Sequence, residues 1–354
     1  MKTLNKVVTT GLSVALASSL LMGTSALAKG EKYTLDSAKL SAPITLDANN
    51  PAWATAPKLD LVLSETPYKP KGFPGLTSTN ATLKSLYDND SIYLFMQYED
   101  PTYSVARYPW IKQEDGSWKQ MKNKDYTGHE NTYYEDKAGV YWDINARGFA
   151  KKGCAITCHM TKDGLNAGVA DTSAGRKYTR KDGQTVDMWH WKSVRTGLAF
   201  DLSHDQYVDH VKSEKKNWGR HGDEKLSGGY KNNMTKDKKM PMYMSKNADN
   251  KLTYLVNADK VPFVDTFKAG DMVPAIVVSK MTGSAADIMT SSVYADGKWT
   301  LVFKRALVTN HPKSKVQDVQ FKDMKKDYYF GVSAFDNTQI NHMYHEGSIK
   351  LNFK

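Results

Sequence analysis

The sequence predicts an all-β protein: an antiparallel β-sandwich with long loop insertions and a few short helices. Short segments rich in Val, Ile, Tyr, Phe and Thr recur along the chain, bounded by Asn, Asp, Gly and Pro. Helical periodicity is weak everywhere except at residues 187–196. Many short strands with few helices are typical of a sandwich. The expected strands are, in chain order, APITLDA, KLDLVLS, ATLKSLYDNDSIYLFMQYED, AGVYWDIN, KLTYLVN, MVPAIVVSK, SSVYADGKWTLVFKRALV, DYYFGVSAFDN and GSIKLNFK.

Two of these segments have the pattern of β-hairpins. The first runs from Ala81 to Glu99 and turns at Asp88-Asn89-Asp90. The second runs from Ser291 to Leu307 and turns at Asp296-Gly297, a pair favoured where both turn residues need a positive φ. Each segment therefore predicts two neighbouring antiparallel strands.

Two stretches do not fit a sandwich strand pattern. Residues 103–133 and about 176–250 are long, polar and rich in Lys, Gly, Asn and Asp. Loops of this length are usually functional or mobile. The chain has no internal repeat and no low-complexity linker. We therefore expect residues 29–354 to form a single domain that carries these two long insertions.

The first 28 residues predict export. They combine two lysines, a short apolar run over Val14–Leu21, and an Ala-x-Ala end at Ala26–Ala28. This order is typical of a secretory signal peptide cleaved after Ala28. The run is too short for a membrane span, which needs about 20 apolar residues. Cleavage would remove two lysines and no acid, so the net charge of +11 falls to +9. We expect a periplasmic protein without a membrane span.

The only two cysteines lie in KKGCAITCHM, residues 151–160. Cys154 and Cys158 are followed directly by His159. A c-type haem needs two thiols for thioether bonds and a histidine for the iron, usually spaced Cys-x-x-Cys-His. Here the spacing is one residue longer. The alternatives are a disulfide that closes a very short loop, which an oxidising compartment permits, and a zinc site, for which a second cysteine pair is missing. The motif favours one covalent haem c.

A second motif, VDMWHWKSVR, spans residues 186–195. Trp189 and Trp191 either pack in the core or wall an apolar haem pocket. Lys192 and Arg195 either lie at the core rim or pair with haem propionates, since Arg binds carboxylates well. His190 and Met188 are further candidates for iron ligands.

A cluster near the C-terminus supplies candidates for the second iron ligand. His342, Met343 and His345 lie within four positions, and all are of types that bind haem iron. His342 is the first choice, with His345, His190 and Met343 as alternatives. Met240, Met242 and Met244 rank behind them, because methionines are more often packing residues. The cations between positions 212 and 239 are either a solvated loop or a docking face for an acidic redox partner; they are Lys212, Lys215, Lys216, Arg220, Lys225, Lys236, Lys238 and Lys239.

These stretches together resemble a known family, the haem-binding proteins related to the γ subunit of ethylbenzene dehydrogenase and similar periplasmic molybdoenzymes. The similar segments keep their order through most of the mature chain; they are ITLDANNPAWATAPKL, YLFMQYEDPT, YYEDKAGVYWDI, MWHWKSVR, GKWTLVFKRAL and YYFGVSAFDN. The resemblance implies a β-sandwich that holds one haem at an edge and takes part in electron transfer.

The sequence also departs from that family. The γ subunits hold a b-type haem through Met and Lys, whereas this chain has Cys154, Cys158 and His159. The place of the γ-subunit lysine falls near His342. The resemblance therefore implies a c-type branch and leaves open whether the partner is a molybdoenzyme. Two functions follow: a periplasmic monohaem cytochrome that transfers single electrons, alone or as a molybdoenzyme subunit, and a haem-free sandwich similar to a carbohydrate-binding module. We expect no catalytic site and no nucleic-acid partner.

Overall fold

The structure, a computed structural model, describes residues 33–67, 75–122, 132–159, 177–210, 219–249 and 251–354, and the backbone of 165–166 and 169–170. The expected signal peptide lies outside these residues. From Tyr33 onward the described chain forms one compact unit. No helix within the described ranges is long and apolar enough to cross a membrane.

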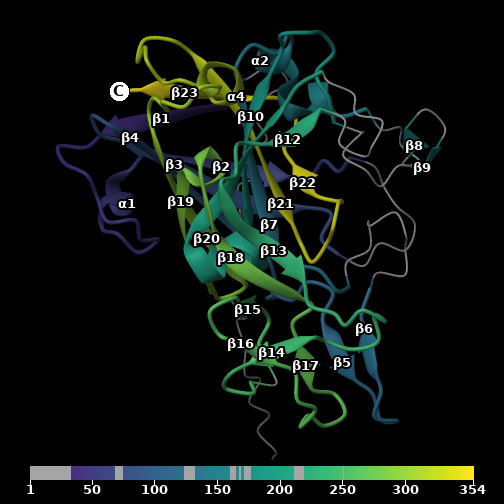
Figure 1. Ribbon diagram of the computed structural model, residues 1–354. Coiled ribbons are helices and arrows are strands. Elements are labelled where there is room, and N and C mark those ends of the chain that lie inside the picture. Colours follow the sequence, from purple (N-terminus) through teal and green to yellow (C-terminus); the bar gives the residue numbers. More distant parts are fainter. Residues whose placement is uncertain are drawn as a thin grey trace, which may run out of the picture. The chain divides into compact units, whose positions relative to one another are not determined.

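The predicted all-β fold is confirmed, and one large sheet contains most of it (Figure 1). Its strands run in the spatial order β1-β23-β21-β7-β10-β11-β19-β20-β4-β3-β2, with β12 beside β11 and β22 beside β21. Their bounds are β1 Tyr33–Lys39, β2 Lys58–Leu63, β3 Thr79–Tyr87, β4 Ser91–Glu99, β7 Lys137–Asp143, β10 Val186–Lys192, β11 Leu202–Val208, β12 Arg220–Gly222, β19 Ile288–Ala295, β20 Lys298–Ala306, β21 Tyr328–Phe335, β22 Met343–Tyr344 and β23 Ile349–Phe353.

Strand β1 closes the sheet between β23 and β3, and β2 lies beyond β3 as an edge strand. It pairs with β23 on one side and with β3 on the other, in both cases in parallel. These two parallel pairings were not expected, because the strand pattern suggested only antiparallel neighbours. This closure leaves fewer open strand edges, which are otherwise sites of unwanted pairing.

The remaining elements are short. Two three-stranded sheets consist of β5 Trp110–Lys112, β6 Trp118–Gln120 and β17 Met272–Val273, and of β13 Ser227–Asn232, β15 Leu255–Val256 and β18 Ile276–Thr282. Two-stranded sheets join β14 Tyr243–Ser245 with β16 Lys260–Pro262, and β8 Leu165–Asn166 with β9 Val169–Ala170. The helices are α1 Ala52–Thr55, α2 Phe149–Lys152, η1 Gly153–Thr157, η3 Ser193–Gly197, α3 Leu198–Phe200, η4 Ser284–Ala286 and α4 Ser314–Gln317.

Both predicted hairpins are present. In the first, the Asp88 carboxylate accepts hydrogen bonds from the backbone N–H of Asp90 and Ser91, at 2.8 and 2.7 Å, and so fixes the turn between β3 and β4. In the second, Asp296 and Gly297 have φ angles of 51° and 69° between β19 and β20. Positive φ at both positions is the requirement of the tightest hairpin turns.

The expectation of loops over residues 103–133 and 176–250 is wrong in part. The first stretch contributes β5 and β6, which lie side by side (Figure 1). The second contains β10 and β11, which are central strands of the main sheet. Residues 187–196, where helical patterning was noted, are strand up to Lys192. All seven residues of β10 are buried, so no polar–apolar alternation marked it.

The backbone of the cysteine segment packs closely against the C-terminal loop at a glycine. Gly153, directly before Cys154, has a φ of 60°, and a Cβ there would lie 1.8 Å from the carbonyl oxygen of Gly347. Gly148, at the other end of α2, has a φ of 91°, yet the nearest atom to a Cβ would be a methyl carbon of Ile156 at 3.9 Å. The backbone of the cysteine segment therefore approaches the loop at Gly153 more closely than any side chain allows.

We predict that Gly153→Ala destabilises the protein far more than Gly148→Ala. Both place alanine at a positive φ, which costs about 1–2 kcal/mol, but only Gly153→Ala forces two backbone segments apart. We expect a loss of about 3 kcal/mol or more in the free energy of unfolding for Gly153→Ala, measured by urea denaturation. Equal losses in the two variants would contradict this close approach.

Candidate functional site

A cavity of about 420 Å³ lies against one face of β7, β10 and β11. This size is within the range of small-molecule sites. The residues that line it are Pro67, Arg107, Tyr134, Lys137, Tyr141, Cys158, Lys177, Met188, His190, Lys192, Arg195, Thr196, His204, Gln206, Arg220, Lys225, Gly229, Tyr230, Met281, Phe335, Gln339, Ile340 and His342.

The alternation of side chains along the strands builds the wall of this cavity. Met188, His190 and Lys192 of β10 face it, and the residues between them face the core. The residues paired with these positions on β7 and β11 extend each of them into a row across the sheet. His190 lies beside Gly139 of β7 and His204 of β11. Gly139 has no side chain to project in front of this row.

The cavity is strongly cationic. Among the described residues that line it, seven are Lys or Arg and none is Asp or Glu. The remaining lining is divided between hydrophobic residues, among them Tyr141, Met188 and Phe335, and polar ones such as His190 and Gln206. A site of this composition suits a ligand that has both apolar surface and negative charge.

Some of the cations have partners inside the protein. The guanidinium of Arg195 forms an ion pair with the fully buried Glu135, which also accepts hydrogen bonds from the backbone N–H of Val194 and Arg195. Lys192 Nζ lies 2.9 Å from Nδ1 of His204. Lys137 Nζ donates to the carbonyl of Gln339 at 2.8 Å. Glu135 thus offsets part of the positive charge of the cavity wall.

The crowding of buried positive charge lowers the pKa of its basic groups. Burial, and then the neighbouring Arg195, hold the pKa of Lys137 and of Lys192 well below 10.5. Burial and the nearby lysines similarly lower the pKa of His190 well below 6.5. Burial therefore disfavours the charged form of each group, and a nearby negative charge would stabilise that form.

His190 is oriented in the manner of a metal-binding histidine. Its Nδ1 lies 2.9 Å from Oε1 of Gln206, which holds the ring in place. Its Nε2 is buried and has no hydrogen-bond partner in the described structure. Ligating histidines usually have one ring nitrogen fixed by a neighbour and the other turned to the metal. His190, one of the alternative ligands proposed from the sequence, therefore has a ring nitrogen available inside the cavity wall.

The C-terminal cluster is divided between three places. His342 lines the cavity, with Nδ1 2.9 Å from the carbonyl oxygen of Ile340 and its ring stacked on Phe335. His345 is buried outside the cavity lining, and its ring contacts Tyr33. Met343 packs in the main core. Of these candidates, only His342 reaches the cavity.

The Cys-His motif lies at the border of the cavity. Cys154 and Cys158 are both free thiols, so the disulfide alternative is not found. Cys158 lines the cavity, whereas Cys154 is buried in a small apolar cluster around Phe149. Burial and the neighbouring Cys158 raise the pKa of Cys154 to about 12. The His159 ring stacks on Tyr178, with Nε2 3.0 Å from the carbonyl oxygen of that residue.

The expectation that Trp189 and Trp191 wall the pocket is wrong. Both are fully buried in the main core, on the face of β10 opposite the cavity. Trp191 contacts Trp299 at 4.8 Å between ring centroids. Met188 lines the cavity, whereas Met240, Met242 and Met244 do not. Arg220 and Lys225, which the sequence suggested for a docking face, line the cavity as well; Lys212, Lys215 and Lys216 lie outside the described residues.

Several cavity residues were not expected from the sequence. Lys137 and Tyr141 come from β7, and His204 and Gln206 from β11. Their alternation with core residues could have been noticed only after β10 was recognised as a strand between these two neighbours, because strand register then aligns Lys137 with Lys192 and Gln206 with Met188.

We predict that Lys137→Met stabilises the apoprotein at neutral pH. The pKa of Lys137 is lowered well below 10.5 in the fold, so the charged lysine destabilises the folded state relative to the unfolded chain. The charged lysine lowers the free energy of unfolding by its full amount at pH values below the folded pKa. This penalty disappears as the pH rises to 10.5. The substitution should add about 1–3 kcal/mol to the free energy of unfolding, and this gain should shrink at alkaline pH. Thermal denaturation at a series of pH values measures it.

The matched control is Lys315→Met, since Lys315 is exposed on α4. This change should leave the melting temperature unchanged at every pH. A Lys137→Met gain that is constant from neutral to alkaline pH would contradict the assigned charge effect.

Comparisons with solved structures find carbohydrate-binding proteins of low similarity. A carbohydrate-binding module of family 9 from Caldicellulosiruptor kristjanssonii, solved with glucose, has 9% identity and a TM-score of 0.33, over 90% of this chain and 96% of that one. A Bacteroides uniformis protein described as carbohydrate-binding has 7% identity and a TM-score of 0.33, over 91% of this chain and all of that one. Neither likeness is close enough to carry an argument about ligands.

No curated protein matches the sequence. A family model described as ethylbenzene dehydrogenase, however, matches residues 50–347, which include every described residue that lines the cavity. This match agrees with the resemblance found from the ordered sequence motifs. The chain belongs to the ethylbenzene dehydrogenase family.

Proposed function

We propose that this protein is an exported c-type cytochrome that binds one haem in the cavity and transfers single electrons. The main support for the proposal is that three features lie in one cavity. These are the thiol of Cys158, the unpartnered Nε2 of His190, and a lining with seven cations and no described carboxylate. Family membership supports an association with a redox enzyme.

The cavity residues match the chemistry of haem part by part. Haem has an apolar macrocycle, two negative propionates and an iron that binds nitrogen or sulfur ligands. Tyr141, Met188 and Phe335 provide apolar surface. Arg and Lys side chains bind carboxylates through charge-assisted hydrogen bonds. An anionic ligand would also offset the mutual repulsion among Lys137, Lys192 and their neighbours.

Each residue of the site has a proposed role. Cys158 and Cys154 hold the haem through thioethers, formed when each S–H adds across a vinyl C=C without gain or loss of electrons. His190 is the iron ligand best supported by its contacts, because Gln206 already fixes its ring. His159 and His342 remain candidates for the other side of the iron. When bound, the haem supplies a one-electron redox centre, and the buried wall excludes water from it.

The two histidines proposed as the second ligand differ in their present contacts and in their position relative to the cavity. Nε2 of His159 is hydrogen-bonded to the Tyr178 carbonyl, and that bond would have to break before Nε2 could bind iron. His342 lines the same cavity as His190, whereas His159 is not among the described residues that line it. The sequence paired His342 with His159; we propose His342 as the partner of His190.

The sugar-binding alternative has less support. A sugar platform needs aromatic rings that the sugar can reach, but Trp189 and Trp191 are fully buried. Its disulfide is also not formed. The proposed partner is a redox protein, either acidic or a molybdoenzyme, and the proposed compartment is the periplasm.

We predict that the haem stays with the polypeptide on acid–acetone extraction. The mass of the mature protein should exceed that of the apoprotein by one haem. Cys154→Ala combined with Cys158→Ala should give extractable haem or none, because no thioether can form. Mass spectrometry and the extraction measure this directly.

The single variants distinguish the two thiols. Cys158 lines the cavity and Cys154 does not, so Cys158→Ala should reduce covalent haem more than Cys154→Ala. A wild-type mass equal to the bare polypeptide, or two protons below it, would refute the cytochrome proposal.

We also predict that His190→Ala changes the haem from low-spin to high-spin and opens a site for carbon monoxide. The absorption spectrum of the purified protein reports both changes. His345→Ala is the matched control, because His345 is equally buried but lies outside the cavity lining; it should leave the spectrum unchanged. If His190→Ala stays low-spin while His342→Ala becomes high-spin, then His190 is not the ligand. A ferric charge-transfer band at the red edge would instead indicate a methionine ligand, for which Met188 and Met281 are the methionines in the described lining of the cavity.

A further inference from the structure

The reverse side of the cavity wall holds a cluster of buried carboxylates. On β11, His204 and Gln206 face the cavity, and Asp205 between them faces the other way. Asp205 there meets Asp287, which follows η4, and Asp318, which follows α4. Oxygen atoms of these three side chains lie within 4.8 Å of one another.

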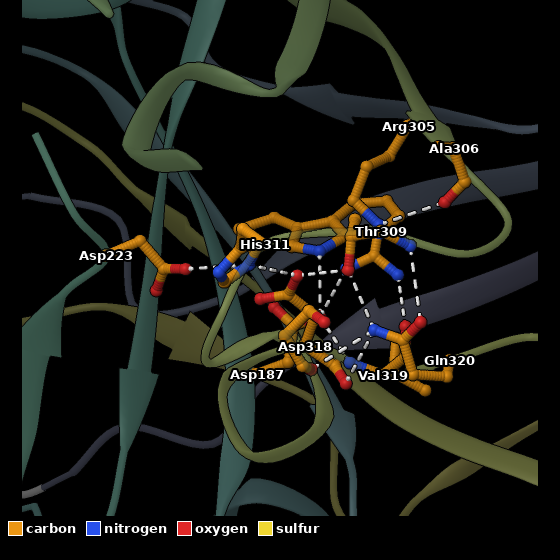
Figure 2. Close-up of polar contacts among 11 residues, drawn as sticks. Asp187, Asp223, Arg305, Ala306, Thr309, His311, Asp318, Val319 and Gln320 are labelled. Carbon is orange, nitrogen blue, oxygen red and sulfur yellow. Dashed lines mark hydrogen bonds and ion pairs between the residues drawn. The ribbon is translucent and has the colours of Figure 1, made fainter. Parts of the chain in front are cut away.

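A second group adjoins the first through Asp318. Asp223, at the end of β12, together with His311 and Asp318, also offers ligand atoms within 4.8 Å of one another. Figure 2 shows His311 between Asp223 and Asp318, with Nε2 of His311 2.8 Å from Asp318 and 3.6 Å from Asp223. The two groups together bring four aspartates and a histidine from separate parts of the chain to one place.

The carboxylates of this cluster lack donors. Asp205 is fully buried, and neither of its oxygens has a hydrogen-bond partner in the described structure. The same holds for both oxygens of Asp223, which is 5% exposed. Asp287 and Asp318 each have one buried oxygen without a partner in the described part of the chain. Buried polar atoms of native proteins nearly always have a partner, so these six oxygens require an explanation.

The nearest arginine makes its direct contacts outside the cluster. Arg305 contacts Asp187, at 2.7 Å, and the carbonyl of Val319, as Figure 2 shows, although its charge also acts on Asp205, Asp287 and Asp318. Asp318 accepts from Thr309 and His311 through one oxygen only. Neither Asp205 nor Asp287 has an ion pair in the described structure. If all four aspartates are ionised, their negative charge exceeds the positive charge of Arg305 and His311.

A third acidic group shows what a cluster satisfied by the protein looks like. Asp100, Asp136 and Asp336 also lie within 4.8 Å of one another. There, however, Asp136 accepts from the backbone N–H of Ser104 and Asn337 and from Trp299, and Asp336 accepts from Leu76 and Thr102. Among the described residues of that group, a single oxygen, on Asp100, has no partner. This group and the group of Asp205, Asp287 and Asp318 each contain three aspartates, and they differ in the hydrogen-bond donors that surround them.

We propose that Asp205, Asp287 and Asp318, with Asp223 beside them, bind a hard divalent cation, for which Ca²⁺ is the best match. Ca²⁺ takes six to eight oxygen ligands in flexible geometry, whereas Mg²⁺ requires near-ideal octahedral geometry and retains water. A dry site with several carboxylate oxygens favours the first. His311 orients Asp318 and Asp223 from the outside.

The alternative explanation is shared protons. The contacts of Asp205 with Asp287, and of Asp223 with Asp318, are close enough for one carboxyl to donate to the other. Burial and the neighbouring carboxylates raise the pKa of Asp223 to about 8. A shared proton would satisfy two oxygens in each pair, the one that donates and the one that accepts, whereas a cation would bind oxygens of three or more carboxylates at once.

A cation at this place would fasten four segments behind the cavity wall. It would tie β11 to the end of β12 and to the turns after η4 and α4. Gln206, which holds His190, and Arg220 lie on these same strands. The cation would thus stiffen the support of the cavity without entering it.

The test measures calcium in the full mature protein by elemental analysis, with iron measured in the same sample so that haem loading is followed separately. We expect one equivalent of Ca²⁺ in the wild type and none in Asp205→Asn. Removing calcium with EGTA should lower the melting temperature of the wild type by about 5 °C relative to a solution with Ca²⁺ at about 100 times its dissociation constant. Mg²⁺ should restore less of this loss.

The matched control is Asp100→Asn, a buried aspartate from the satisfied cluster, which should keep its equivalent of Ca²⁺. The melting temperature of Asp205→Asn should not respond to EGTA or Ca²⁺. A wild type that binds no Ca²⁺ in titration calorimetry, and whose melting temperature is the same in EGTA and in Ca²⁺, would overturn the proposal in favour of shared protons. That result would leave the haem proposal untouched, since iron and spin state are read separately.

Discussion

Two strands in the middle of the sheet, β10 and β11, separate buried positive charge on one face from buried negative charge on the other. His190 and Lys192 face the cavity, whereas Asp187 and Asp205 face the opposite side. The period-two alternation of a strand makes this possible within a few residues. A shift of one residue in the register of β10 would move His190 and Lys192 to the face that holds the carboxylates, and Asp187 to the cavity face. The rest of the site depends on this register.

On each face, buried groups of one charge outnumber the protein groups of opposite charge that contact them. Transferring a charge from water to a protein interior is costly unless a partner is present. The protein supplies some partners, such as Glu135 for Arg195 and Arg305 for Asp187. The charges without such partners are the basis for the two proposed ligands. These are an anionic group with apolar surface in the cavity and a small cation at the carboxylate cluster. Binding of either would stabilise the folded chain, because an unfolded chain has neither site.

Much of the fold could be predicted from the sequence, whereas the site could be predicted only in part. The hairpins at Asp88 and Asp296 carry local turn chemistry, so a short window suffices to find them. Strand β10 is buried on both faces, and its sequence therefore lacks the alternation by which strands are recognised. That is why Trp189 was placed in the pocket and Lys137 was overlooked. The acidic cluster combines residues from β11 to α4 that no sequence spacing relates.

The cysteine segment and the cavity wall contribute to the site in different ways. The wall residue His190 is held by strand pairing on both sides and by Gln206, so its position is fixed before any ligand binds. Cys158, by contrast, follows a short helix that rests on the C-terminal loop through Gly153. A covalent bond tolerates an attachment point outside the sheet, because it does not depend on precise preorganisation, whereas an iron ligand does. In the proposed haem site, a rigid strand for the ligand and a loop for the covalent link would suit the two tasks, and this division accounts for a motif of which Cys158 lines the cavity while Cys154 and His159 do not.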